Sequence, residues 1–81
     1  MTLLKQVTPP THAYTITPND TVNLATPISS FMVGGEGNIR VLTVGDDTVT
    51  LPVQAGIQYV LFVKRIYTTD TTATNIIGFS L

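Results

Sequence analysis

Residues 34–53 read GGEGNIRVLTVGDDTVTLPV and contain two runs in which side chains of different character alternate. The first run puts Ile39 and Val41 on one face of an extended chain. The second, residues 48–53, puts valine and leucine on one face and threonine on the other. A period of two is typical of β-strands, and Gly45-Asp46-Asp47 between the runs has the residue types of a tight hairpin turn. The stretch therefore predicts an antiparallel hairpin.

The glycine cluster at the start of this stretch, Gly34, Gly35 and Gly37, invites comparison with a nucleotide-binding loop. A dinucleotide fingerprint needs a further glycine three positions on and a helix after it, whereas Gly37 is followed by Arg40 and a strand. Glu36 would also repel a phosphate group. We interpret the three glycines as a β-corner that uses positive φ angles.

Catalytic and metal-binding motifs are the next possibility. Gly45-Asp46-Asp47 is similar to the acidic turn of polynucleotide polymerases, but such an enzyme needs further acidic residues on another strand and a far larger chain. His12 is the single histidine, and the serines Ser29, Ser30 and Ser80 belong to no triad motif. We therefore expect no catalytic residue, no metal site, no cofactor and no enzyme activity.

Composition favours a protein that works in an assembly. The 81 residues form one small domain, and such a domain buries only about 60 to 65 % of its surface on folding. No cysteine is present, and 11 % of the residues are charged, against about 25 % in a typical soluble domain. We expect part of the surface to be covered by protein, first of all by copies of the same chain. The net charge of -1 disfavours nucleic acid as a partner, and no apolar run reaches the roughly 20 residues of a membrane span.

The rest of the chain reads as further short strands without a convincing helix. The runs HAYTIT, DTVNLA, ISSFMV and NIIGFSL are set apart by loop segments and by breakers such as Pro18-Asn19 and Thr26-Pro27. Together with the hairpin they predict an all-β domain over residues 12–81. The expected architecture is a small antiparallel β-sandwich or a jelly-roll-like barrel of six to eight short strands.

Residues 58–67, QYVLFVKRIY, are apolar on both faces of an extended chain. Such a strand is either central in the fold or shared between the core and a subunit contact. Left exposed, it would also be an aggregation hazard. We hypothesise that it forms the contact between copies, with Tyr59, Leu61, Phe62 and Val63 in the interface. The expected faces are Val60, Phe62 and Ile66 on one side and Tyr59, Leu61, Val63 and Tyr67 on the other.

Residues 1–11, MTLLKQVTPPT, differ from the rest of the chain. Pro9 and Pro10 exclude a helix and favour an extended course, while Leu3 and Leu4 put two apolar groups beyond this stiff spacer. We predict an extended N-terminal arm that buries its leucines on a neighbour; a frayed terminus is the alternative.

Several short motifs follow one another in residues 12–81. They are Thr17-Pro18-Asn19-Asp20-Thr21, then ATP before FMVGGEGNI, DTVT, Ala55-Gly56, VKRI and TTATNI. In this order and spacing they resemble the spike base proteins, a family of small proteins encoded by tailed bacteriophages and gene transfer agents.

The resemblance implies a structural virion protein: a compact all-β unit that forms a symmetric ring on the capsid surface, at vertices, and carries a fibre or spike. The implied partners are copies of the chain, the major capsid or vertex protein, and a fibre or spike protein. No nucleic acid or membrane partner is implied, and assembly would take place in the bacterial cytoplasm. A pentamer is favoured because capsid vertices are five-fold, and a trimer is next. The arm, with Leu3, Leu4, Pro9 and Pro10, would dock on the capsid or on an adjacent copy.

Two other functions stay open. A decoration or cement protein would cover many capsid sites and have no fibre partner. A carbohydrate-binding module would use Tyr14, Tyr59 and Tyr67 as a sugar platform, although tyrosines serve equally in a core or an interface.

Overall fold

The computed structural model describes residues 10–81, which contain six β-strands and no helix. The six strands form one antiparallel sheet in the order β1-β6-β2-β5-β3-β4. The prediction of an all-β antiparallel fold is confirmed, while most of the predicted arm lies outside the described residues. The strands are β1 (His12–Ile16), β2 (Ile28–Gly35), β3 (Gly37–Thr43), β4 (Thr48–Val53), β5 (Tyr59–Ile66) and β6 (Thr74–Ser80).

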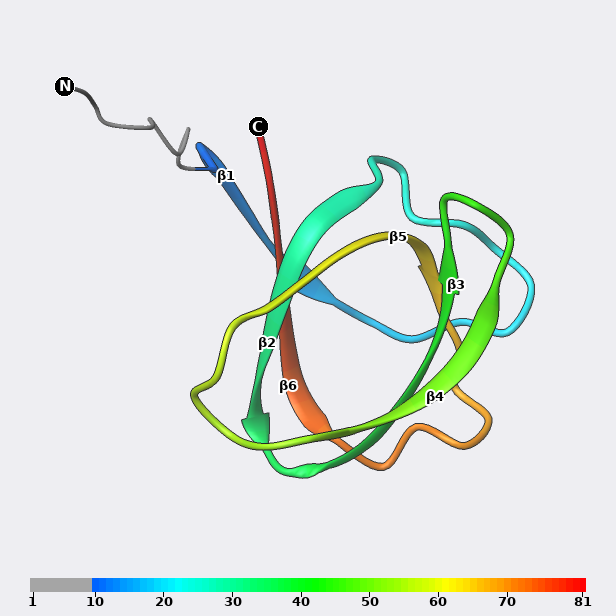
Figure 1. Ribbon diagram of the computed structural model, residues 1–81, viewed down its shortest axis with the longest axis vertical. Helices are drawn as coiled ribbons and strands as arrows, with labels where there is room; N and C mark the ends of the chain where they lie inside the picture. The colour runs from blue at the N-terminus through cyan, green and yellow to red at the C-terminus, as the bar shows by residue number, and fades with distance from the viewer. Residues whose placement is uncertain (1–9) are drawn as a thin grey trace, which may run out of the picture.

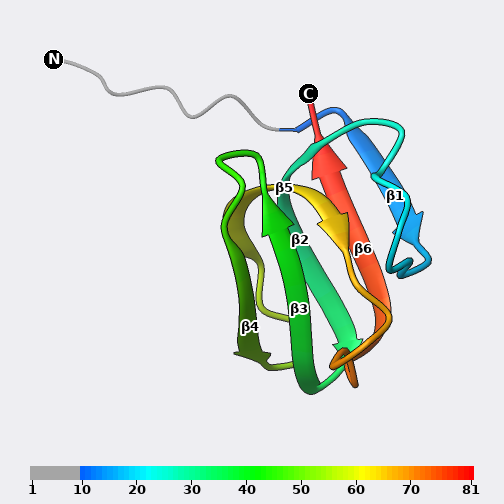
Figure 2. The same ribbon diagram turned by 90° about the vertical axis from the view of Figure 1, so that its right-hand side faces the viewer.

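The sheet is strongly curled, with β1 at one edge and β4 at the other (Figures 1 and 2). Beyond β4 the chain returns to β2, where Ala55 forms a parallel bridge with Val33. The N–H of Gly56 donates to the carbonyl of Val33 at 3.0 Å. The four strands β2, β5, β3 and β4 thus form a closed, barrel-like arrangement. The other two strands, β6 and β1, extend the sheet beyond β2. Of the two architectures left open by the sequence, the structure has the single, barrel-like sheet.

The core lies on the inner side of this curl. The hairpin contributes Ile39, Val41 and Val53 to it, as the alternation in residues 34–53 predicts. Half-buried side chains, among them Leu51 and Tyr59, pack around its margin. The largest fully buried side chains are Phe31, Ile28, Ile39, Ile66, Val33, Val41 and Val63.

β5 contains an extra residue that changes which side chains point inward. Leu42 pairs with Arg65 whereas Thr43 pairs with Val63, so Lys64 has no counterpart in β3. A β-bulge of this kind shifts the alternation by one position. Val63 and Ile66 are therefore both buried, and the prediction that Ile66 shares a face with Val60 and Phe62 is wrong.

The segment between β1 and β2 is a loop, so the prediction of a strand at residues 20–25 is also wrong. The Asn19 side chain accepts hydrogen bonds from the N–H groups of Thr21 and Val22, at 2.9 and 3.0 Å. Such local bonds compete with a strand ladder. The loop continues along β5, where the N–H of Leu24 donates to the carbonyl of Lys64 at 2.8 Å.

Candidate functional site

Among the apolar side chains of the sheet, those on the outward side of β5 are the most exposed to solvent. Val60 is 85 % exposed and Phe62 is 57 % exposed. They point outward because Tyr59, Leu61 and Val63 alternate with them and turn toward the core. Exposure of two large apolar groups so close together on one strand marks a surface that favours contact with protein.

This apolar surface continues over β2 and β6. Val60 pairs with Ser30, and Ser30 pairs with Phe79, while Met32 pairs with Ile77. Directly paired residues of antiparallel strands project on the same side of a sheet. Ser30 is itself buried and accepts a hydrogen bond from the Gln58 amide at 2.8 Å. We call this surface the outer apolar face; its members are Val60, Phe62, Met32, Ile77 and Phe79.

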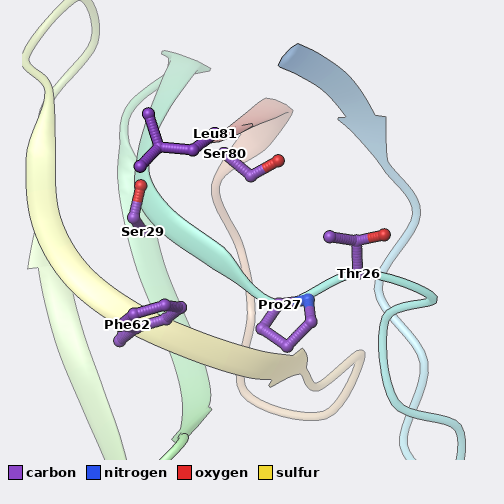
Figure 3. Close-up of a pocket in the computed structure, with 6 residues that line it drawn as sticks. All are labelled: Thr26, Pro27, Ser29, Phe62, Ser80 and Leu81. Carbon is purple, nitrogen blue, oxygen red and sulfur yellow. The ribbon is translucent and has the colours of Figure 1, made fainter. Parts of the chain in front are cut away.

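An apolar pocket of about 320 Å³ lies at one end of the outer apolar face (Figure 3). Phe62 of β5 and Leu81 beyond β6 stand on two of its sides, and Leu81 is 67 % exposed. Its lining contains no charged side chain. The residues that line it are Thr26, Pro27, Ser29, Phe62, Ser80 and Leu81.

The four residues predicted for the subunit contact occupy different environments. Phe62 lies on the outer apolar face. Leu61 is half-buried and turned inward, and Val63 is completely buried in the core, where it offers no surface to another molecule. Tyr59 stacks on Phe31 with ring centroids 5.7 Å apart, and its hydroxyl accepts a hydrogen bond from the N–H of Gln54 at 2.8 Å.

Sequence reasoning placed Val60 beside Phe62 but did not include it in the contact, and it missed the contribution of β2 and β6. Alternation along one strand assigns a side chain to a face. It does not tell which other strand lies beside it, so Phe79 and Ile77 could be joined to β5 only through the strand order.

The corner glycines lie at the end of β2 and the start of β3, and the reason predicted for them is wrong. Gly34, Gly35 and Gly37 do not have positive φ angles; among the described glycines that angle belongs to Gly56, at 79°. They are needed because atoms of residues 72–75 come close. A Cβ atom at Gly37 would lie 2.8 Å from the backbone nitrogen of Ala73, and one at Gly35 would lie 2.0 Å from Oγ1 of Thr74.

Gly45, Asp46 and Asp47 lie in the turn between β3 and β4. Asp46 takes the left-handed conformation, with φ at 70°. The Thr43 hydroxyl accepts a hydrogen bond from the N–H of Asp47 at 3.0 Å. Lys64 of β5 forms an ion pair with the Asp46 carboxylate, and the N–H of Val44 donates to the carbonyl of Phe62 at 3.0 Å, so this turn is held by local bonds and by contacts with β5.

The remaining polar side chains hold loops in place. Asp20 accepts hydrogen bonds from the N–H and the hydroxyl of Thr69, at 2.9 and 2.8 Å, and these bonds lower the pKa of its carboxyl below the usual value. The guanidinium groups of Arg40 and Arg65 both lie near the ring of Tyr67, with their central carbons 4.6 and 5.5 Å from its centroid. Within residues 10–81, no three histidine, aspartate or glutamate side chains gather as a metal site would require. No helix in this part of the chain could cross a membrane.

The tyrosines considered as a sugar platform do not share one surface. Tyr59 packs against the core, and the ring of Tyr67 is approached by the guanidinium groups of Arg40 and Arg65. The hydroxyl of Tyr14 accepts a hydrogen bond from the buried Ser80 at 3.2 Å. The described surface is therefore better suited to broad apolar contact than to stacking on a sugar ring.

Comparison with known proteins finds a related solved structure. No family model matches the sequence, and no curated protein matches it. A solved structure, the capsid of a native gene transfer agent (GTA) particle computed with C5 symmetry, contains a chain that matches with a TM-score of 0.82 and 32 % sequence identity. The match covers 89 % of this chain and 84 % of the other.

Proposed function

Because this chain belongs to the family of the gene transfer agent capsid chain that it matches, we propose that it is a structural protein on the capsid surface of a tailed bacteriophage or a related particle. The observation that carries the proposal is the agreement in fold and sequence over nearly the whole length of both chains. In its finer form, the protein is the base of a spike: a ring at a capsid vertex that anchors a fibre.

The outer apolar face supports a ring of identical copies. A standard protein interface covers about 800 Å² on each partner. A ring member makes two such contacts, which together would cover about a third of the 4930 Å² of accessible surface that the chain presents. Coverage on this scale accounts for a surface with so few charges. Val60 and Phe62 would be the centre of one contact, while Tyr59, Leu61 and Val63 support them from beneath.

Five-fold symmetry is the first choice for this ring and three-fold symmetry is next. The matched capsid was computed with C5 symmetry, and a closed ring uses two different patches on each copy, so its order follows from the angle between them. Attachment to the capsid would gain from this arrangement, because several weak contacts presented together bind more tightly than any one of them.

The first test is the solution mass of the full chain, measured by light scattering during size-exclusion chromatography. We expect a stable species at five times the chain mass of 8.7 kDa, or at three times that mass. The second test is electron microscopy of particles assembled with and without the protein. Density lost only at vertices supports a spike base, density lost over the whole surface replaces it with a decoration protein, and unchanged particles contradict a capsid role.

A further inference from the structure

The apolar pocket between β2 and β5 has room for side chains that the described residues do not supply. We propose that it receives Leu3 and Leu4 from the N-terminal arm of the adjacent copy in the ring. The inference depends on the proposed function, which puts copies side by side, and adds to it a defined receptor for the arm.

The pocket is formed where the two strands lose their regular pairing. Ile28 pairs with Val63 but Ser30 pairs with Val60, so β5 has one residue more than β2 between these points. Irregular pairing of this kind bends a strand and redirects its side chains. It leaves Phe62 on one side of the opening and Pro27 on the other. The pocket volume of about 320 Å³ lies at the small end of the range of about 300–1,000 Å³ for binding cavities.

The arm has the chemistry that this pocket would accept. Residues 1–9 read MTLLKQVTP, with three aliphatic side chains and one charged side chain, Lys5. The six lining side chains carry no charge, so a leucine side chain can enter without contacting a charged side chain. Burying one leucine side chain is favourable by about 1.5–3 kcal/mol of free energy. In a ring, each copy would contribute one such stabilising contact.

The position of the arm also fits. The N–H of Thr11 donates to the carbonyl of Ser80 at 2.9 Å, and Ser80 and Leu81 both belong to the pocket. The arm therefore leaves the domain at the same end of the sheet as the pocket. When copies stand side by side in a ring, the start of one arm lies at the level of the neighbour's pocket.

The length of the arm favours its insertion into the pocket of the adjacent copy over insertion into the pocket of its own chain. Pro9 and Pro10 fix their φ angles near those of an extended polyproline helix. Leu4 precedes Pro10 by six residues, a length that could span about 19 Å if extended at roughly 3.1 Å per residue. The chain's own pocket lies beside Thr11, so reaching it would require the arm to reverse. Residues 1–9 contain no glycine to help such a reversal.

Disulfide crosslinking tests the proposal directly because the natural chain contains no cysteine. Full-length Leu4→Cys and Ser29→Cys chains are mixed in equal amounts and oxidised. We expect a covalent dimer on a non-reducing gel that a reductant removes. A chain that carries both substitutions should give a ladder of covalent species that ends at the ring order.

The control pairs Leu4→Cys with Thr50→Cys, which is exposed on β4 away from the pocket. Its crosslinking yield should be at least tenfold lower; an equal yield would overturn the proposal. A disulfide confined within single doubly substituted chains would overturn it too, because the arm would then occupy its own pocket. A ring of correct mass without any crosslink would reject the arm receptor alone, whereas a monomer that also fails to bind capsids would reject the proposed function as well.

Discussion

Gly78 of β6 lies so close to Ile28 of β2 that a Cβ atom at position 78 would be 2.7 Å from Cγ2 of Ile28. The same atom would be 3.2 Å from Cδ1 of Ile16 in β1. Both isoleucines are buried, and both cross the inner surface of β6 at this point. The absence of a side chain at Gly78 thus lets core residues from two neighbouring strands meet over the third.

The first prediction is that Gly78→Ala lowers the free energy of unfolding by about 1–3 kcal/mol, since the added methyl group must push buried side chains out of their rotamers. Urea denaturation followed by circular dichroism measures the change. Gly45→Ala is the matched control, because the nearest atom to its new methyl group would be 3.8 Å away. Equal stability of the two variants would show that β6 can move away from Ile28.

The second prediction concerns the turn between β3 and β4. Asp46 has φ at 70°, a region in which a β-branched residue is strongly disfavoured. Asp46→Val should therefore destabilise the fold by about 1–2 kcal/mol, whereas Asp47→Val, next to it in the same turn, should change stability by about 0.5 kcal/mol or less. Thermal unfolding compares the two variants, and Asp46→Asn should be tolerated because asparagine accepts the left-handed conformation. A larger loss from Asp47→Val would contradict this assignment of the turn.

The third prediction is a pH dependence that originates at Asp20. The pKa of its carboxyl in the folded protein lies below the usual 3.8 because Thr69 donates two hydrogen bonds to it. A carboxyl whose folded pKa is depressed stabilises the fold above the unfolded pKa, and this contribution disappears as pH falls through the folded pKa. Asp20→Asn should thus be less stable than the natural chain at pH 7, and the difference should shrink below pH about 4.

Urea denaturation of both chains between pH 7 and pH 2 measures this difference. Glu36→Gln, which removes one negative charge near the junction of β2 and β3, serves as the control for net charge. A gap between Asp20→Asn and the natural chain that stays constant over the whole range would exclude the Asp20–Thr69 contact as its source.

The hairpin is the part of this fold that local sequence specifies. Ile39 and Val41 are buried as expected because alternation and turn chemistry are both short-range properties, readable within residues 34–53. The face of Ile66 was predicted wrongly by the same reasoning. The alternation of residues along β5 does not show that Lys64 is an extra residue in a β-bulge. The loop at residues 20–25 was mistaken for a strand because the side chain of Asn19, which a pattern of apolar residues ignores, organises it.

The candidate site could not be predicted in full from the sequence, because its residues come from three strands whose order in the sheet is a long-range property. The apolar character of residues 58–67 was evident, yet the sequence could not tell which side of β5 faces solvent. Val63 was expected at the surface and is in the core, while Val60 is the more exposed residue. Phe79 joins the same face only because β6 lies next to β2, and that pairing connects residues 49 positions apart.

The last prediction tests the outer apolar face itself. Val60 is 85 % exposed, so Val60→Asp should leave the free energy of unfolding of the isolated chain within about 0.5 kcal/mol of the natural value. If the face is buried against another copy, the new carboxylate would be desolvated without a partner, at a cost of about 3–5 kcal/mol for each contact. That cost corresponds to a weakening of assembly by a factor of about 100 or more, and the ring should dissociate to monomers.

Light scattering during size-exclusion chromatography measures this loss of mass, and circular dichroism shows that the fold is retained. Val22→Asp is the matched control: Val22 is 60 % exposed in the loop between β1 and β2, away from the face. Loss of the ring in Val60→Asp alone would locate the contact on β5, since the two variants differ only in where they put the same charge. If Val60→Asp keeps the full mass, the outer face of β5 is free in the assembled ring. The copies must then meet elsewhere, and the apolar face is left for the capsid or the fibre.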